Sequence, residues 1–356
     1  MSESFEAGLA RGEAAASAAG DASAPSSNGG RMYVRTQSFG STDADLRFLQ
    51  RCGVRHKAAV FPFHADRGWV LDDLLREKER YEAFGISLDM SSLPIYERFP
   101  NIIYHGKSPE RDREIDIVCD MIRTASRAGI DSLRYNTCIL PIDRTEPEEG
   151  RGGFLHTAFR LDRISQEELA TLTDAGRVTA DMHWERIEYL LERMIPVAEE
   201  CKVRMACHPC DPWLPPGFRG VDRVLGGPDG FKKFIDICPS DYHGVNLCLG
   251  CMAEASTDPR NQVPEIIRYF GSRNKIFLCH FRNIVGGQNK FQEVWPDEGV
   301  MSMYRNIRAL KETGYLHMIV PDHAPGHEDS DAYQAWAYEF GYIQAMIQAV
   351  TEAEAA

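Results

Sequence analysis

The sequence lacks the features of a membrane, secreted or nucleic-acid-binding protein. No stretch approaches the roughly 18 consecutive apolar residues that span a bilayer, and the N-terminus lacks the basic region and apolar block of a secretory signal. The 40 Lys and Arg residues are outnumbered by 53 Asp and Glu residues, and the net charge of -13 disfavours binding to a phosphate backbone. We therefore expect a cytoplasmic protein that acts on a small molecule and binds neither membrane nor nucleic acid.

Cysteine is too sparse for a disulfide scaffold, with ten residues in 356. In a reducing compartment most of these thiols should be free or should bind metal. Large apolar side chains are almost absent from residues 1–30, which are rich in Ala, Ser, Gly and Glu. Such a segment cannot offset the entropy of ordering by burial. We predict a disordered tail over residues 1–30 and a single catalytic domain over residues 31–356.

After Arg31, short runs rich in Val, Ile, Leu and Phe alternate with amphipathic helical patterns, which is typical of βαβ units. Eight runs read as strands: Met32–Gln37, Val54–Phe61, Ser87–Leu93, Ser132–Ile139, Arg204–His208, Gly244–Cys248, Lys275–His280 and His317–Pro321. Helices are predicted between them at Leu71–Phe84, Arg111–Ala128, Trp184–Glu200, Val263–Tyr269, Ser302–Thr313 and Ala332–Val350. The pattern predicts an α/β fold of the (β/α)8 TIM-barrel type with loop insertions. A doubly wound sheet is the alternative, but no GxGxxG follows an early strand.

The last four predicted strands each end in a side chain that can bind metal. These side chains are His208, Cys248, His280 and Asp322. In a barrel of this type the catalytic groups lie at the carboxyl ends of the strands, so the four should converge. Two imidazoles, a thiolate and a carboxylate form a plausible metal site with positions left for substrate.

A closed structural zinc site is the competing interpretation, because Cys207 and Cys210 form one CxxC pair and Cys248 and Cys251 another. The pairs are separated more widely than is usual for such sites. Neighbouring residues of a strand also point to opposite faces, so Cys207 and His208 cannot both face the barrel interior. A thioredoxin-like redox role is disfavoured too, since the motif does not follow the first strand. Cys207, Cys210, Cys251 and Cys279 read as packing thiols.

At these same motifs the sequence resembles the mannonate dehydratase family of xylose-isomerase-like barrels, from about Arg31 to the C-terminus. Order and spacing agree at Leu93-Pro94-Ile95-Tyr96-Glu97, Tyr135-Asn136, His208-Pro209-x-Asp211-Pro212, Cys248-x-Gly250, His280-x-Arg282, and Pro321-Asp322-His323 followed by Tyr333. The resemblance implies a Mn²⁺ ion held by the four side chains named above. The thiolate by itself would favour Zn²⁺, and Fe²⁺ or Mg²⁺ stay open.

The resemblance further implies that water is removed from a sugar acid, which is D-mannonate or a related aldonic acid, to give a 2-keto-3-deoxy acid. Proton removal at C2 and loss of the C3 hydroxide need acid–base groups, for which His323 and Tyr333 are the candidates. Arg282 is a candidate partner of the substrate carboxylate, although it could equally pair with a nearby acid such as Asp211. The remaining candidates for substrate binding are Asn136, Asp211 and Arg223.

Three positions depart from the family pattern. Val320 stands where the family usually has Arg, Gln292 where it has His, and Cys210 where it has Asp. The changes at Val320 and Gln292 predict a substrate other than mannonate, such as another acid or a polyol. A metal-dependent sugar isomerase or epimerase on the same barrel is the alternative function, and a non-catalytic barrel is a third. The sequence is compatible with a homo-oligomer.

Overall fold

The computed structural model describes residues 30–37, 39–326 and 332–352. The predicted tail therefore lies, except for Gly30, outside the described residues. The assignment of residues 31–356 to one catalytic domain stays a prediction.

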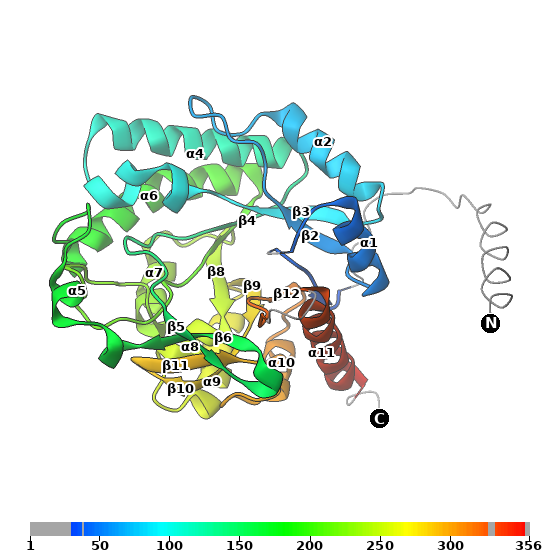
Figure 1. The fold of residues 1–356 in the computed structure, drawn as a ribbon. Helices are drawn as coiled ribbons and strands as arrows, with labels where there is room; N and C mark the ends of the chain where they lie inside the picture. Colours follow the sequence, from blue (N-terminus) through cyan, green and yellow to red (C-terminus); the bar gives the residue numbers. More distant parts are fainter. Residues whose placement is uncertain (1–29, 38, 327–331, 353–356) are drawn as a thin grey trace, which may run out of the picture. The chain divides into compact units, whose positions relative to one another are not determined.

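A barrel of parallel strands confirms the predicted fold class (Figure 1). Eight strands follow one another in the order β1, β12, β9, β8, β7, β4, β3 and β2, and every pair along this order is parallel. Between β1 and β2, a single bridge joins Thr36 to Lys57 and nearly closes the barrel. Each strand lies within a predicted run or overlaps it: β1 (Tyr33–Val34), β2 (His56–Ala59), β3 (Ser87–Ser92), β4 (Ser132–Tyr135), β7 (Arg204–Cys207), β8 (His243–Cys248), β9 (Ile276–Phe281) and β12 (Met318–Pro321).

The helices surround these strands. All six predicted helices are present, as α2 (Leu71–Glu82), α4 (Pro109–Arg127), α6 (Ala180–Cys201), α9 (Pro259–Gly271), α10 (Met303–Glu312) and α11 (Ala332–Glu352). Each buries an apolar stripe; in α4 this stripe includes Ile115, Val118, Ile122 and Ala125. The structure adds α1 (Asp43–Arg51), α3 (Ile95–Arg98), α5 (Gln166–Ala170), α7 (Pro228–Ile237) and α8 (Leu249–Glu254). Among the described residues, no helix combines the length and the apolar character needed to cross a membrane.

Side chains alternate between the inside and the outside of the barrel along each strand. In β4, Leu133 and Tyr135 are buried in the large core between strands and helices. A smaller apolar cluster fills the barrel interior and consists of Met90, Ala206, Phe277, Leu278, Met318 and Val320. Because β4 and β7 pair with Arg134 opposite Ala206, the side chain of Arg134 belongs to the interior set.

A second sheet was not predicted and is built from two of the loop insertions. It is antiparallel, with the order β10 (Asn283–Gly287), β11 (Lys290–Val294), β6 (Leu155–Arg160) and β5 (Thr145–Glu149). One hairpin follows β4 and the other follows β9, so the sheet lies at the carboxyl end of the barrel strands (Figure 1). The rings of Phe159 and Phe291 stack between the hairpins with centroids 6.0 Å apart. This small sheet brings further side chains to the predicted site.

Candidate metal centre

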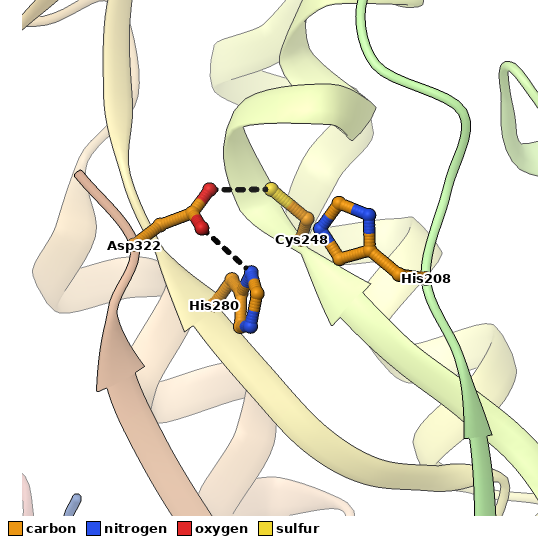
Figure 2. Close-up of side chains that lie close together, drawn as sticks. All are labelled: His208, Cys248, His280 and Asp322. Carbon is orange, nitrogen blue, oxygen red and sulfur yellow. Dashed lines mark hydrogen bonds and ion pairs between the residues drawn. The ribbon is translucent and has the colours of Figure 1, made fainter. Parts of the chain in front are cut away.

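The four predicted ligands lie together at the carboxyl ends of β7, β8, β9 and β12. One ligand atom from each of His208, Cys248, His280 and Asp322 lies within 4.8 Å of the other three. Figure 2 shows the four side chains pointing toward a common space, with Asp322 in contact with both Cys248 and His280. Cys248 and His280 are completely buried, and Asp322 is 5% exposed. We call these four residues the ligand cluster.

The ring of His208 is oriented so that one nitrogen is free for a ligand. Nδ1 lies 2.7 Å from the carbonyl oxygen of Pro209 and donates its proton there. Nε2 is buried and has no hydrogen-bond partner among the described residues. A buried imidazole nitrogen without a partner is costly, and a metal ion would satisfy it. The hydrogen bond to Pro209 thus selects the tautomer that presents a lone pair to the cluster.

His280 has a comparable partner in Asn246, which lies on the neighbouring strand. The Asn246 amide nitrogen is 2.9 Å from His280 Nε2, and the Asn246 Oδ1 atom is buried without a partner. If the Asn246 side-chain amide were flipped by 180°, Oδ1 would accept a hydrogen bond from Nε2 of His280. Nδ1, which lies 2.8 Å from Asp322 Oδ1, would then carry the lone pair for a metal.

The surrounding charges and hydrogen bonds favour the thiolate form of Cys248 and the carboxylate form of Asp322. Burial raises the pKa of the Cys248 thiol, but the hydrogen bond with Cys251 and the charge of Arg282 outweigh it and hold the pKa well below its ordinary value. Burial likewise raises the pKa of Asp322, whereas His280, His323 and Arg282 hold it well below its ordinary value. The cluster thus offers a thiolate and a carboxylate with two imidazoles, a donor set that fits a divalent metal.

Arg282 is 3% exposed and is surrounded by carboxylates of the protein. Its guanidinium group lies 3.1 Å from Asp211, 2.9 Å from Glu254 and 3.3 Å from Asp322, and it also pairs with Glu293. Asp211, Cys251 and Glu254 form a second group of metal-capable side chains, but Arg282 Nη2 lies 3.3 Å from Cys251 Sγ and occupies this space. The predicted role of Arg282 at the substrate stays a prediction.

Gly250 explains how Arg282 reaches this position. A Cβ atom at residue 250 would collide with the guanidinium group of Arg282. The glycine of the Cys248-x-Gly250 motif therefore makes room for the arginine of the His280-x-Arg282 motif. The two motifs, which are separate in the sequence, form one packed unit.

His323 lies beside the ligand cluster and is held by the small sheet. Its Nδ1 atom lies 2.7 Å from Glu293 Oε2, and 38% of its side chain is exposed. Burial lowers the pKa of His323, but Asp322 and Glu293 outweigh this and raise it to about 9. With Arg282 and Glu293, His323 lines a cavity of about 100 Å³ that also contacts His156 of the small sheet.

Sequence reasoning missed Glu293, Arg144 and Glu254, which join the charged network. Arg144 lies 2.8 Å from Asp211 and 3.0 Å from Glu293. Glu293 directly follows Gln292, one of the three departures from the family pattern, so the sequence contained a signal for it. Arg144 and Glu254 lie outside the quoted motifs, and their proximity depends on the fold of the loop after β4 and of α8.

The remaining predicted site residues lie in several environments. The Tyr333 hydroxyl donates to Asp45 at 2.8 Å, and its ring stacks on Phe48 at 4.5 Å. Arg223 donates hydrogen bonds of 2.6 Å to the carbonyl oxygens of Pro212 and Pro141. The Asn136 Oδ1 atom accepts a hydrogen bond of 3.4 Å from the backbone amide of Cys138. The roles of Tyr333, Arg223, Asn136 and Asp211 stay predictions.

Val320 and Gln292, the two departures on which the substrate prediction rests, lie in different environments. Val320 is 1% exposed, belongs to the interior cluster and pairs in register with His280. Gln292 instead donates to the backbone carbonyls of Glu148 and Glu149 in β5. Its neighbour Glu293, which points to the opposite face of β11, is the residue of this segment that reaches His323. Residue 320 therefore adjoins a member of the ligand cluster, whereas residue 292 contacts the backbone of the small sheet.

A structural zinc site formed by the two CxxC pairs receives no support. The groups of metal-capable side chains found in the described part of the chain contain Cys248 or Cys251, but not Cys207 or Cys210. Cys207 contributes to the large core outside the barrel and is completely buried. All ten cysteines are free thiols.

The fold is similar to that of solved xylose-isomerase-like barrels. A xylose isomerase domain protein from Planctomyces limnophilus superposes with a TM-score of 0.59 at 12% identity, covering 90% of this chain and 98% of that one. The mannonate dehydratase from Streptococcus suis superposes with a TM-score of 0.79 at 23% identity, covering 91% and 95%.

The family is defined more narrowly by sequence. The model of the D-mannonate dehydratase (UxuA) family matches residues 157–355, which is more than half of the chain. A mannonate dehydratase from Streptococcus uberis is 30% identical over 328 residues, covering 82% of this chain and 91% of that protein. The chain belongs to the D-mannonate dehydratase family. The resemblance stated from the motifs is thereby confirmed.

Proposed function

We propose that this chain is a metal-dependent dehydratase that removes water from D-mannonate or a related aldonic acid and gives a 2-keto-3-deoxy acid. The observation that carries the proposal is the convergence of the four ligand atoms within 4.8 Å of one another. Family membership supports the reaction type. The proposal includes the cytoplasmic location and the single catalytic domain expected from the sequence.

The metal would be held by His208, Cys248, His280 and Asp322. Bound there, a divalent ion would supply positive charge to offset the negative charge that develops on the substrate oxygens. The identity of the metal as Mn²⁺ rests on the family resemblance, since the Cys248 thiolate is a softer ligand than Mn²⁺ prefers. The surrounding charges agree with a cation, because the carboxylates of Asp211, Glu293 and Asp322 and the Cys248 thiolate outnumber the guanidinium groups of Arg282 and Arg144.

His323 is suited to proton transfer. Glu293 holds its Nδ1 atom at 2.7 Å and leaves Nε2 on the side of the cluster, 3.9 Å from Asp322 Oδ1. The partial exposure of the side chain lets a substrate reach this nitrogen. In the proposed reaction, Nε2 exchanges a proton with C2 or with the departing C3 hydroxyl, and Tyr333 is the second proton-transfer group.

Metal analysis combined with a screen of aldonic and uronic acids tests the proposal. We expect about one divalent ion per chain and the formation of a 2-keto-3-deoxy acid, detected as its semicarbazone. Only dehydration yields this product; an isomerase or epimerase would return an isomer of the same mass. A purified chain that holds no metal and converts none of the acids would contradict the proposal.

A further inference from the structure

We propose that Arg134 binds the carboxylate of the substrate, and that the site therefore selects an acid over a neutral sugar or polyol. The inference builds on the proposed function, whose substrate class it explains. Arg134 lies outside the motifs that carry the family resemblance.

The register of β4 places Arg134 in the barrel interior. Its Cα is paired with Ala206 on β7 and with Ser92 on β3, and Ala206 belongs to the interior apolar cluster. His208 is two residues beyond Ala206 and points to the same face. Arg134 therefore projects into the barrel from the strand next to the one that leads to His208.

The guanidinium group of Arg134 has at least one hydrogen-bond donor without a partner among the described residues. Its Nε atom is buried without a hydrogen-bond partner, and no ion pair to Arg134 is formed within the described ranges. The other arginines near the site differ, because Arg282 and Arg144 are each bound to carboxylates. The interior Arg35 is also paired, at 3.2 Å from Asp89. A half-buried guanidinium without a partner is unfavourable unless a ligand supplies the anion.

Strand register places Arg134 beside the ligand cluster, because Ala206, its partner on β7, precedes His208 by two residues. Burial lowers the pKa of Arg134, while Asp322, Glu97 and Cys248 act in the opposite direction. The guanidinium group thus lies within the influence of Asp322 and Cys248 but forms no ion pair with either.

The interior Arg35 is already paired with Asp89, and the interior side chains next to Arg134 in the described chain include an apolar set. Met90, Ala206, Leu278, Met318 and Val320 form an apolar floor. A sugar acid lying on this floor would find its cation in Arg134. The uncharged Val320 therefore does not prevent the site from holding an acid.

The test compares Arg134→Gln and Arg134→Lys with the wild type, and uses Arg204→Gln as the matched control. Arg204 begins β7 at the opposite end of the barrel and pairs with Asp131 at 3.0 Å. Metal content and thermal unfolding are measured first, followed by calorimetric binding of 2-keto-3-deoxy-D-gluconate and of mannitol, and by the KM for D-mannonate.

For Arg134→Gln we expect unchanged metal content, about 10- to 100-fold weaker binding of the acid, and no change for mannitol. Lysine should recover part of the loss, because it keeps the charge but not the fork of donors. Arg204→Gln should bind the acid like the wild type. Equal acid binding by Arg134→Gln and the wild type would overturn the inference even if the wild type dehydrates mannonate. A wild type that binds the acid through Arg134 but forms no keto-deoxy product would instead overturn the proposed function alone.

Discussion

At the scale of single residues, hydrogen bonds from the protein decide which atoms are available to a metal. The Pro209 carbonyl oxygen accepts a hydrogen bond from Nδ1 of His208, and Asn246 contacts Nε2 of His280. Cys248 caps α8 by accepting from the Cys251 amide at 3.4 Å, which also favours its thiolate. Each of these three ligands is thus oriented by a neighbour outside the ligand cluster.

Removing either charged ligand should therefore abolish metal binding while the barrel stays folded. For Cys248→Ala and Asp322→Asn we expect metal affinity to fall by at least about 100-fold, because a charged donor of the site is lost. Metal content after dialysis, measured by mass spectrometry, checks this. Cys207→Ala is the control, since Cys207 is equally buried but belongs to the core outside the barrel. Full metal content in Cys248→Ala would show that the thiolate is not a ligand.

A substitution at His323 should affect proton transfer without affecting metal binding. His323→Asn should keep about one metal per chain but lower kcat by roughly 100-fold, the usual scale for lost acid–base catalysis. Steady-state kinetics and metal analysis on the same sample measure both quantities. A near-normal kcat would mean that another group moves the proton.

Tyr333→Phe tests whether Tyr333 transfers protons, as proposed, or has only a structural role. The Tyr333 hydroxyl is bound to Asp45, a carboxylate that also caps α1. If Tyr333 transfers protons, we expect kcat to fall by about 100-fold with little loss of stability. If it only anchors α11 to α1, unfolding free energy should drop by about 1 kcal/mol while kcat is unchanged.

At the scale of elements, the small antiparallel sheet connects the two inserted hairpins to the catalytic end of the barrel. It carries Glu293, which contacts Arg282, Arg144 and His323. The sheet is held by Phe291 and Phe159, which are 1% and 0% exposed. The position of His323 therefore depends on packing between segments that are distant in the sequence.

Phe291→Ala should loosen this sheet and disturb the site without unfolding the barrel. Truncating a buried phenylalanine typically costs about 3–5 kcal/mol, here lost mainly within the small sheet. We expect faster hydrogen exchange in β6 and β11 and a lower kcat at unchanged metal content. Phe234→Ala in α7 is the control, because Phe234 is also completely buried but packs against His243. Equal effects of the two variants on kcat would argue against a special role of the small sheet.

At the scale of the whole molecule, two histidines whose pKa is lowered by the fold predict loss of stability in mild acid. Burial lowers the pKa of His243 from 6.5 to about 4, although the hydrogen bond to the Phe234 carbonyl opposes it. Burial and Arg204 lower the pKa of His317 to about 4 as well. Because the unfolded chain takes up these protons first, stability is lost as the pH falls from 6.5 toward 4.

For His243 the free energy of unfolding should fall by about 2 kcal/mol between pH 7.5 and pH 5. Urea unfolding at a series of pH values, with metal-free protein throughout, measures this slope. His243→Gln should show a shallower pH dependence, whatever its absolute stability. An identical slope in the variant would show that other groups cause the acid sensitivity.

The local sequence carried most of the information about the barrel. Apolar runs of strand length and amphipathic helical patterns indicated eight strands and six helices, since both depend on short-range periodicity. The four ligands were found because each directly follows or ends a strand. The inserted hairpins escaped prediction, because β5 and β10 have little apolar alternation. The two hairpins join into one sheet only where β11 pairs with β6, as Phe291 does with Phe159, and these strands lie more than 120 residues apart in the sequence.

The sequence by itself determined the (β/α)8 fold, the family and the set of four candidate ligands, because periodicity and motif spacing are properties of neighbouring residues. Only the tertiary structure decided which charges meet. It enclosed Arg282 among carboxylates, set Gln292 and Glu293 on opposite faces of β11, and left Arg134 without an ion pair in the described chain. These outcomes depend on strand register and on contacts between distant segments, which no local pattern specifies.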